Sequence, residues 1–158
     1  MKLAGIEEDR LHLAWVSSAE AQRFVDTATA VTDSVKEYGA FDQGAFEMEL
    51  TAAKMAAESE PIRWLVGKEI ALTTGNDVYG RKWDVESYES NLDAIIEREY
   101  KKNLIFLAIR EGYSSVRDIS KRIGLDLLQV SYLLADLEHT NRVEFTGMND
   151  SKPVFAAL

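Results

Sequence analysis

Two short helices separated by a single glycine, close to the C-terminal end of the chain, constrain the fold most. Ser115, followed three residues later by Asp118, predicts the start of a helix over 116–123, because a hydroxyl at the N-cap accepts a free backbone N–H. Gly124 supplies the turn after it, and Asp126 predicts the start of a second helix. Two capped helices joined by a glycine turn are typical of a helix-turn-helix.

A hairpin is expected directly after the second helix, which ends near Asn141 because asparagine tolerates the left-handed backbone conformation. Segments 143–146 and 153–157 carry strand-forming residues and flank 147–150, which we expect to form an open tip. A long amphipathic helix precedes these elements. This order of elements predicts a winged helix-turn-helix domain over 91–158.

A short strand followed by a helix is expected at the N-terminal end. Apolar residues alternate with others over 11–16, which is the period of a strand with one apolar face. Ser17 precedes Glu20 by three residues, a spacing at which both side chains can cap a new helix. Apolar residues then recur every three or four positions as far as Gly39, which predicts the end of the helix. Residues 1–40 are therefore interpreted as the strand–helix tail of an α/β unit.

This strand and helix are expected to be incomplete by themselves, because one strand cannot form a sheet. The N–H and C=O groups of a strand over 11–16 have to pair with another strand. We expect that strand in another protein subunit, in a second copy of this chain, in missing upstream sequence, or in the C-terminal hairpin. Trp15, Ser17 and Glu20 are therefore candidate partner-interface residues.

The segment 41–90 is predicted to be a helical connector. Its first helix ends or kinks before Pro61, which lacks the N–H that an uninterrupted helix uses, and a second helix begins there. The residues that we expect this second helix to bury are Ile62, Trp64, Leu65 and Val66. A loop over 73–80 follows, and Tyr79 and Trp83 are further candidate interface residues, since aromatic rings carry much interface energy. The whole chain is thus expected to be mainly α, an α+β fold with little strand.

Composition excludes several classes of protein. The 158 residues include no cysteine, which excludes disulfides, thiolate zinc sites and cysteine-ligated iron–sulfur clusters within the chain. No apolar stretch is long enough to span a bilayer, and the N-terminus has no signal core, so we expect a soluble, cytoplasmic protein. Phosphate-binding and nucleophile motifs are absent, and His12 and His139 are expected to be structural. No catalytic, cofactor-binding or metal-binding residue is therefore assigned.

The helix-turn-helix raises the alternative of DNA binding. The net charge is −9; residues 1–90 hold 9 basic and 17 acidic side chains, and residues 91–158 hold 9 and 10. Neither part has the basic excess that a phosphate backbone attracts, so we expect the domain to pack against protein instead. If it binds DNA, the contacts are expected from Arg117, Lys121, Arg122, Gln129, Ser131, Tyr132 and Lys152.

The run GIEEDRLHLAWVSSAE, Gly5 to Glu20, resembles the closing strand and helix of the methyl-viologen-reducing hydrogenase delta subunit family. That family has an arginine, alternating apolar residues that end in Trp-Ile, and then Ser-Ala-Ser-Glu-Gly before a helix. Ser17 and Ala19 lie close to this pattern, and Phe24 follows in the helix. Ala21 stands where the family usually has glycine.

The resemblance extends over most of the chain, to family members that have a C-terminal extension. These members have a segment similar to Arg63–Lys68, which reads RWLVGK here, and an Asn-x-Val-Tyr-Gly loop similar to Asn76–Gly80. They also end in a winged helix. None of the shared motifs is catalytic.

The resemblance implies a role in anaerobic electron transfer. The family is associated with a cysteine-ligated iron–sulfur centre that passes electrons between a hydrogenase or other donor and heterodisulfide reductase-like subunits. Those cysteines lie upstream of the matched region, so the cluster is expected only in an upstream part or in a partner. The resemblance therefore implies a non-catalytic docking or scaffolding subunit, or a fragment of a longer one, in such an oxidoreductase complex. The alternative is a winged-helix transcription regulator that binds DNA.

Overall fold

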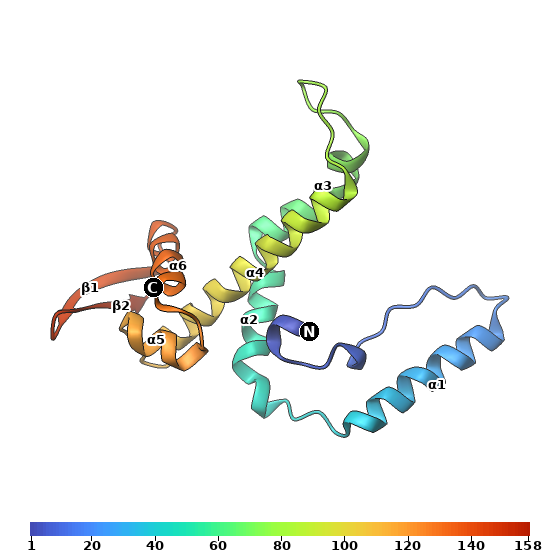
Figure 1. The fold of residues 1–158 in the computed structure, drawn as a ribbon, viewed down its shortest axis with the longest axis horizontal. Helices are drawn as coiled ribbons and strands as arrows, with labels where there is room; N and C mark the ends of the chain where they lie inside the picture. The colour runs from blue at the N-terminus through green and yellow to red at the C-terminus, as the bar shows by residue number, and fades with distance from the viewer. The chain divides into compact units, whose positions relative to one another are not determined.

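The computed structural model describes every residue from Met1 to Leu158 and is mainly helical (Figure 1). It contains six α-helices, three short 3-10 helices and one antiparallel sheet of two strands at the C-terminal end. The chain forms two compact units, unit 1 over Met1–Glu49 and unit 2 over Leu50–Leu158. The predicted mainly helical fold with little strand is therefore confirmed.

In unit 1, Arg10 connects the N-terminal segment to the end of the helix that follows it. Its elements are η1 (Lys2–Ala4), η2 (Glu8–Arg10), α1 (Ala21–Tyr38) and η3 (Gly44–Phe46). The Arg10 guanidinium donates hydrogen bonds to the carbonyl oxygens of Tyr38 (3.1 Å) and Gly39 (3.0 Å) at the end of α1. It also lies over the rings of Tyr38 and Phe41. Because a helix C-terminus leaves carbonyl groups without partners, this cation both caps α1 and ties η2 to it.

Residues 11–16 form no strand within the chain, so the expectation that they pair with a strand of another subunit or a second copy remains a prediction. The backbone of Leu11 is extended (φ −128°, ψ 118°), but the N–H groups from His12 to Val16 have no hydrogen-bond partner. The only sheet in the structure is the C-terminal hairpin. An extended segment becomes a strand only by pairing, and unit 1 contains no second strand. The helix predicted to follow this segment is confirmed and begins at Ala21.

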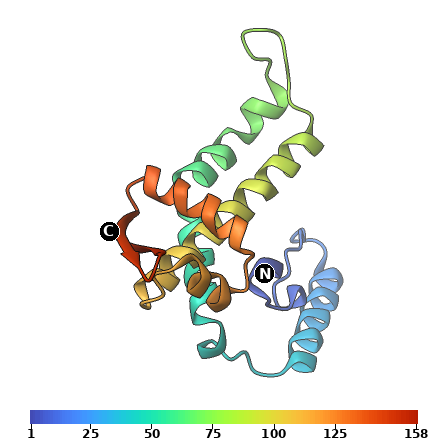
Figure 2. The same cartoon turned by 60° about the vertical axis from the view of Figure 1, so that its left-hand side comes forward.

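In unit 2, the helices over 60–74 and 85–110 run side by side. α2 (Glu47–Ala57) and α3 (Glu60–Thr74) are separate helices, as the missing N–H of Pro61 predicts. α3 packs against α4 (Val85–Arg110), and the loop over 75–84 that joins them extends beyond both (Figures 1 and 2). The buried Tyr88 of α4 donates its hydroxyl to the Leu65 carbonyl oxygen of α3 at 3.2 Å.

Only two of the four residues that we expected α3 to bury are buried. Ile62 and Leu65 lie in the core, whereas Trp64 is 56% exposed and Val66 is also exposed. A helix turns about 100° per residue, so the face that carries Ile62 and Leu65 cannot also carry Trp64, and Val66 lies at its edge. The prediction for Trp64 and Val66 was therefore wrong.

The C-terminal part of α4 packs with α5 (Val116–Ile123) and α6 (Leu127–His139). Both predicted N-caps are formed. Ser115 Oγ accepts the N–H of Asp118 at 3.2 Å, and the Asp126 carboxylate accepts the first free N–H groups of α6. Gly124 ends α5 in the left-handed conformation, with φ 70°. The fully buried side chains of this region are Ile105, Ile119, Val130, Leu134, Leu137 and Val143.

The hairpin consists of β1 (Val143–Asn149) and β2 (Lys152–Ala157). The open tip predicted over 147–150 is wrong, because pairing continues to Asn149 opposite Lys152. Asp150 and Ser151 both have positive φ (45° and 62°) and form a two-residue turn whose twist matches that of the strands. The register of the pairing shifts between Phe145 and Gly147, which is an irregularity of the β-bulge type.

Candidate functional site

The segment 11–16 combines exposed apolar side chains with an unpaired backbone. Leu13 is 88% exposed and Trp15 is 81% exposed. Both alternate with residues of the opposite face, and the N–H groups from His12 to Val16 have no partner. These are the two features that strand addition uses, since the backbone provides ladder hydrogen bonds and alternate side chains provide specificity. The structure thus places the predicted interface residue Trp15 on an accessible surface.

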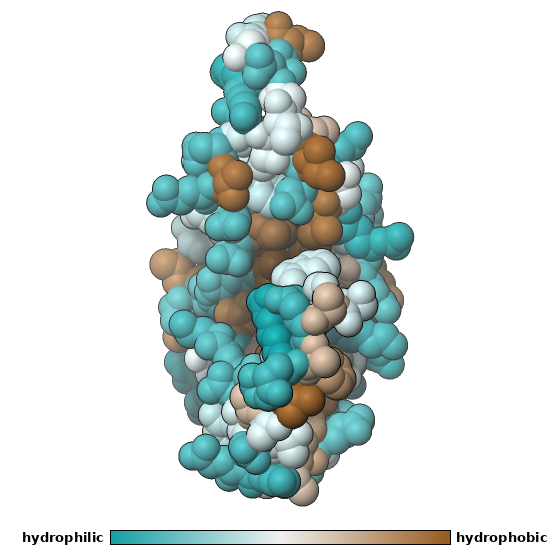
Figure 3. Space-filling model, turned by 90° about the vertical axis from the view of Figure 1, so that its right-hand side faces the viewer, coloured by the Kyte–Doolittle hydropathy of each residue, from teal (hydrophilic) through white to brown (hydrophobic).

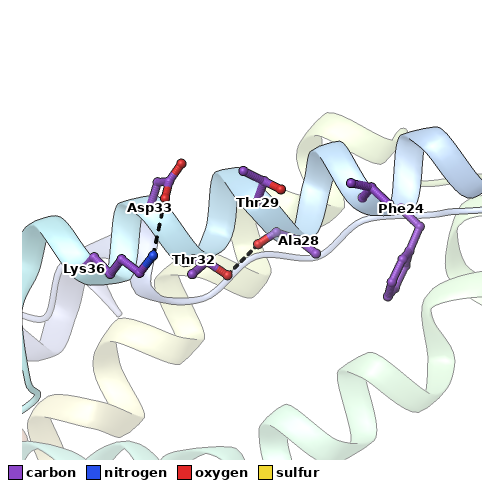
Figure 4. A pocket seen from close by; sticks show the side chains of 7 residues that line it. Phe24, Ala28, Thr29, Thr32, Asp33 and Lys36 are labelled. Carbon is purple, nitrogen blue, oxygen red and sulfur yellow. Dashed lines mark hydrogen bonds and ion pairs between the residues drawn. The ribbon is translucent and has the colours of Figure 1, made fainter.

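The helix α1 has an apolar face that unit 1 does not bury. No residue of α1 is buried, and Phe24, Val25 and Val35 are all exposed. A shallow pocket of about 380 Å³ lies along this face. In Figure 4 the Phe24 side chain points away from the helix, and the Asp33–Lys36 ion pair lies farther along. Because most helices in proteins are stabilised by packing of an apolar face, α1 has a surface ready for a partner.

Ser17 and Glu20, the other two candidate interface residues of this region, form a local hydrogen bond before α1 and remain accessible. The Glu20 carboxylate accepts the Ser17 N–H at 2.8 Å, and Arg23 pairs with the same carboxylate at 3.1 Å. The Ser17 N–H bond, followed by the Arg23 bond, lowers the pKa of Glu20 below its ordinary value. These two residues fix the turn that leads from the extended segment into α1.

Tyr79 and Trp83 lie on the loop over 75–84, which Asp77 holds rigid. One Asp77 oxygen accepts the N–H groups of Tyr79 and Arg81, each at 2.8 Å, and the other accepts Arg81 Nε at 2.8 Å. Tyr79 is 78% exposed, Trp83 is less so, and Val78 between Asp77 and Tyr79 is almost fully exposed. In Figure 3 brown, apolar side chains are visible at the top of the molecule, where this loop lies. The loop therefore presents apolar side chains on a preformed backbone.

The basic candidates for DNA contact are only partly available. Arg122 pairs with Glu111 at 2.8 Å and lies over the Tyr113 ring. Arg117 and Lys121 on α5 are exposed and form no ion pair, and Lys152 is exposed at the start of β2. The structure therefore brings two unpaired cations together on α5.

The exposed face of α6 is apolar over its first turns and carries the exposed carboxylate of Glu138 in its last turn. Tyr132 is 70% exposed, and Leu128 is also exposed on the same face, one turn earlier. Ser131, between them, donates its hydroxyl to the Leu127 carbonyl oxygen, and Gln129 is half-buried. A base-reading helix presents free donors and acceptors, so this face suits a protein surface better than a base edge.

The sequence analysis missed a polar cluster between α4, the α2–α3 junction and the turn before β1. Lys102 is buried and pairs with Glu99 at 3.0 Å and with Asp136 at 3.1 Å. Beside it, Arg142 Nη1 donates to Asn103 Oδ1 at 2.8 Å. The sequence feature that could have indicated this cluster is Asn103, which stands at a core position of the apolar stripe of α4.

No group of three or more histidine, cysteine or acidic side chains is placed to hold a metal ion. None of the helices has both the length and the apolar content that crossing a membrane requires. No known protein family, no curated protein and no solved structure matches the chain.

Proposed function

We propose that this protein is a docking or scaffolding component of a larger protein assembly and has no catalytic activity alone. The observation that carries the proposal is the unpaired backbone from His12 to Val16, with Leu13 and Trp15 exposed beside it. An extended segment followed by an amphipathic helix is half of an α/β layer. A sheet edge of a partner would pair with the segment, and the partner's apolar surface would cover α1.

The resemblance of the sequence supports an electron-transfer complex of the hydrogenase or heterodisulfide reductase type as this assembly. In the proposal the complex is cytoplasmic, and its iron–sulfur or flavin centres belong to partner subunits or to an upstream part. This chain contributes binding surfaces. The exposed Tyr79 and the rigid loop that carries it supply a second contact, because aromatic anchors on preformed loops lose little entropy on binding.

We further propose that residues 91–158 form a winged helix-turn-helix used for protein contact. The succession of α4, α5, the Gly124 turn, α6 and the hairpin supports this fold. An additional bridge between Ser115 and Val154 connects the start of α5 to the hairpin. The exposed Leu128 and Tyr132 on the first turns of α6 support a protein partner.

The experiment is co-purification of the complete chain with iron–sulfur or flavin subunits encoded near it. Trp15→Lys is expected to abolish the association, because it places a charge on the apolar face of the pairing segment. Ala14→Lys, on the opposite face, is the matched control and is expected to weaken it less. In hydrogen exchange, the amides from His12 to Val16 are expected to be protected only in the complex. Isolation as a monomer that binds no such subunit would contradict the proposal.

DNA binding is a second candidate, favoured by the exposed and unpaired Arg117 and Lys121 on α5. This candidate predicts that the protein binds duplex DNA. Its affinity for DNA is expected to fall between 50 mM and 200 mM salt, by about 10-fold or more for every few phosphate contacts. Arg117→Gln with Lys121→Gln is expected to reduce that affinity, and Lys36→Gln on α1 is the control. Absence of salt-dependent duplex binding would remove this candidate.

A further inference from the structure

A cavity in unit 2 has properties that neither docking nor DNA binding explains. It has a volume of about 490 Å³ and lies where the α2–α3 junction, α4 and the turn before β1 meet. Its lining includes Glu58, Ser59, Glu60, Asn103 and Arg142. The volume is within the range of small-molecule sites, and an otherwise largely apolar lining carries these polar and charged side chains.

Two buried polar atoms at this cavity lack partners. Asn103 is only 1% exposed; its Oδ1 accepts a hydrogen bond from Arg142, but its Nδ2 has no partner. Ser59 Oγ is likewise buried without a partner. Native proteins pair nearly all such groups, so an unpartnered amide beside a cavity indicates an acceptor that binds there.

The start of α3 adds further donors. Ser59 is the N-cap of this 15-residue helix, but its side chain caps no N–H. Pro61 has no N–H, and the N–H groups of Glu60 and Ile62 have no protein partner. A helix N-terminus with free N–H groups favours an anionic group.

Arg142 supplies a cation that forms no ion pair with a carboxylate. Its guanidinium is half-buried, lies over the Phe106 ring at 4.5 Å, and forms no ion pair. Burial lowers the pKa of Arg142 below its ordinary value, although the charge of Glu99 partly opposes this. Lys102, by contrast, is already paired with Glu99 and Asp136. The guanidinium is thus the charge available to a bound carboxylate.

The same cavity also carries carboxylates that no cation neutralises. Glu58 and Glu60 are exposed at its edge and form no ion pair. They would repel a purely anionic ligand, whereas an ammonium group would pair with them. We propose that this cavity binds a small zwitterion of the amino-acid class, with its carboxylate at Arg142 and Asn103 and its ammonium at Glu58 and Glu60.

The test uses the complete chain and each of the twenty standard amino acids as probes in a thermal-shift screen, followed by calorimetry. At least one amino acid is expected to bind, whereas acetate and methylammonium, each with one of the two charges, are expected to bind at least 10-fold more weakly. Failure of all twenty to bind, or equal binding of acetate, would overturn the proposal.

Variants identify the residues. Arg142→Gln is expected to weaken binding at least 10-fold, and Arg110→Gln, outside the cavity lining, is the matched control. Because Arg142→Gln also removes a hydrogen bond of the fold, Glu58→Gln with Glu60→Gln provides a second variant at exposed positions. This pair is expected to weaken amino-acid binding and to raise the relative affinity for acetate. Unchanged binding in both the arginine variant and the glutamate pair would overturn the assignment of the site.

Discussion

Arg10 Nη2 donates a hydrogen bond to the carbonyl oxygen of Tyr38 at 3.1 Å, across 28 residues of sequence. The same guanidinium lies over the Tyr38 ring, and the Tyr38 hydroxyl donates to Asp9 Oδ2 at 3.2 Å. These contacts join η2 to the end of α1. The extended segment and α1 are therefore presented together because one arginine closes the loop.

Arg10→Ala is expected to destabilise unit 1 by about 2 kcal/mol, because hydrogen bonds from a charged donor contribute more than neutral ones. Amide exchange of the last turn of α1 should become faster, while that of α6 in unit 2 should be unchanged. Arg23→Ala is the control, since the exposed Arg23–Glu20 pair contributes little. Equal effects of the two substitutions on α1 exchange would contradict the role of Arg10.

Ile105→Ala is expected to lower the free energy of unfolding of unit 2 by about 2–5 kcal/mol, because Ile105 is fully buried and the substitution leaves a cavity. The matched control is Ile70→Ala, which removes the same atoms from an exposed position on α3 and should change stability by less than about 0.5 kcal/mol. Urea unfolding followed by far-ultraviolet circular dichroism measures both. Similar losses for the two variants would show that the core is placed wrongly.

Asp126→Ala is expected to destabilise unit 2 by about 1 kcal/mol, since its carboxylate accepts the N–H groups of Leu128 and Gln129 at the start of α6. Asp93→Ala, at an exposed position in the middle of α4, serves as the control and should leave stability nearly unchanged. The two proteins can be compared by their urea midpoints. A midpoint for the Asp126 variant equal to that of the parent would exclude the cap.

Stability of unit 2 is expected to fall in acid because of Asp136. Burial alone would raise the pKa of Asp136, but the hydrogen bond and charge of Lys102, with those of Arg98, lower it below its ordinary value. A lowered folded-state pKa stabilises the protein above the unfolded-state pKa of about 3.9. That stabilisation is lost as the pH falls through the folded-state pKa.

Urea unfolding between pH 2 and pH 7 measures this dependence, with Asp136→Asn as the comparison. The variant should be less stable at pH 7 by about 1–3 kcal/mol, because Lys102 loses one of its two carboxylate partners. The difference between variant and parent should shrink as the pH is lowered. A difference that does not depend on pH would refute the contribution of Asp136.

The helices were predictable because their signals are local. Ser115 and Asp126 each cap the helix that they were predicted to start, and Gly124 has the left-handed backbone that its position indicated. Caps and turns depend on residues two or three positions apart, so the sequence contains all the information that they need.

The segment 11–16 could not be assigned from local sequence. Its alternation of apolar residues describes a strand, but a strand exists only when a second strand pairs with it. The contacts of the predicted partner-interface residues likewise depend on the surface of the partner, which the local sequence does not contain. Trp15 and Tyr79 are accessible, and Ser17 and Glu20 form the local hydrogen bond that their three-residue spacing indicated.

The cavity in unit 2 could not be predicted either, because its parts are distant in sequence. Asn103 and Arg142 are 39 residues apart. Ser59 lies in a third part of the chain, the junction between α2 and α3. Only the packing of α4 against α6 brings the first two together. An isolated asparagine in an apolar stripe indicates a polar core contact but not the identity of its partner.

The exposure of all three tryptophans gives the molecule a built-in optical reporter. Trp15, Trp64 and Trp83 are each in contact with water in the free chain. The fluorescence emission of an indole ring moves to shorter wavelength when water leaves the ring. A protein that covers one of these tryptophans is therefore detected by a shift of the emission spectrum, without a label. Replacing the three one at a time by phenylalanine would then reveal which surface a given binder occupies.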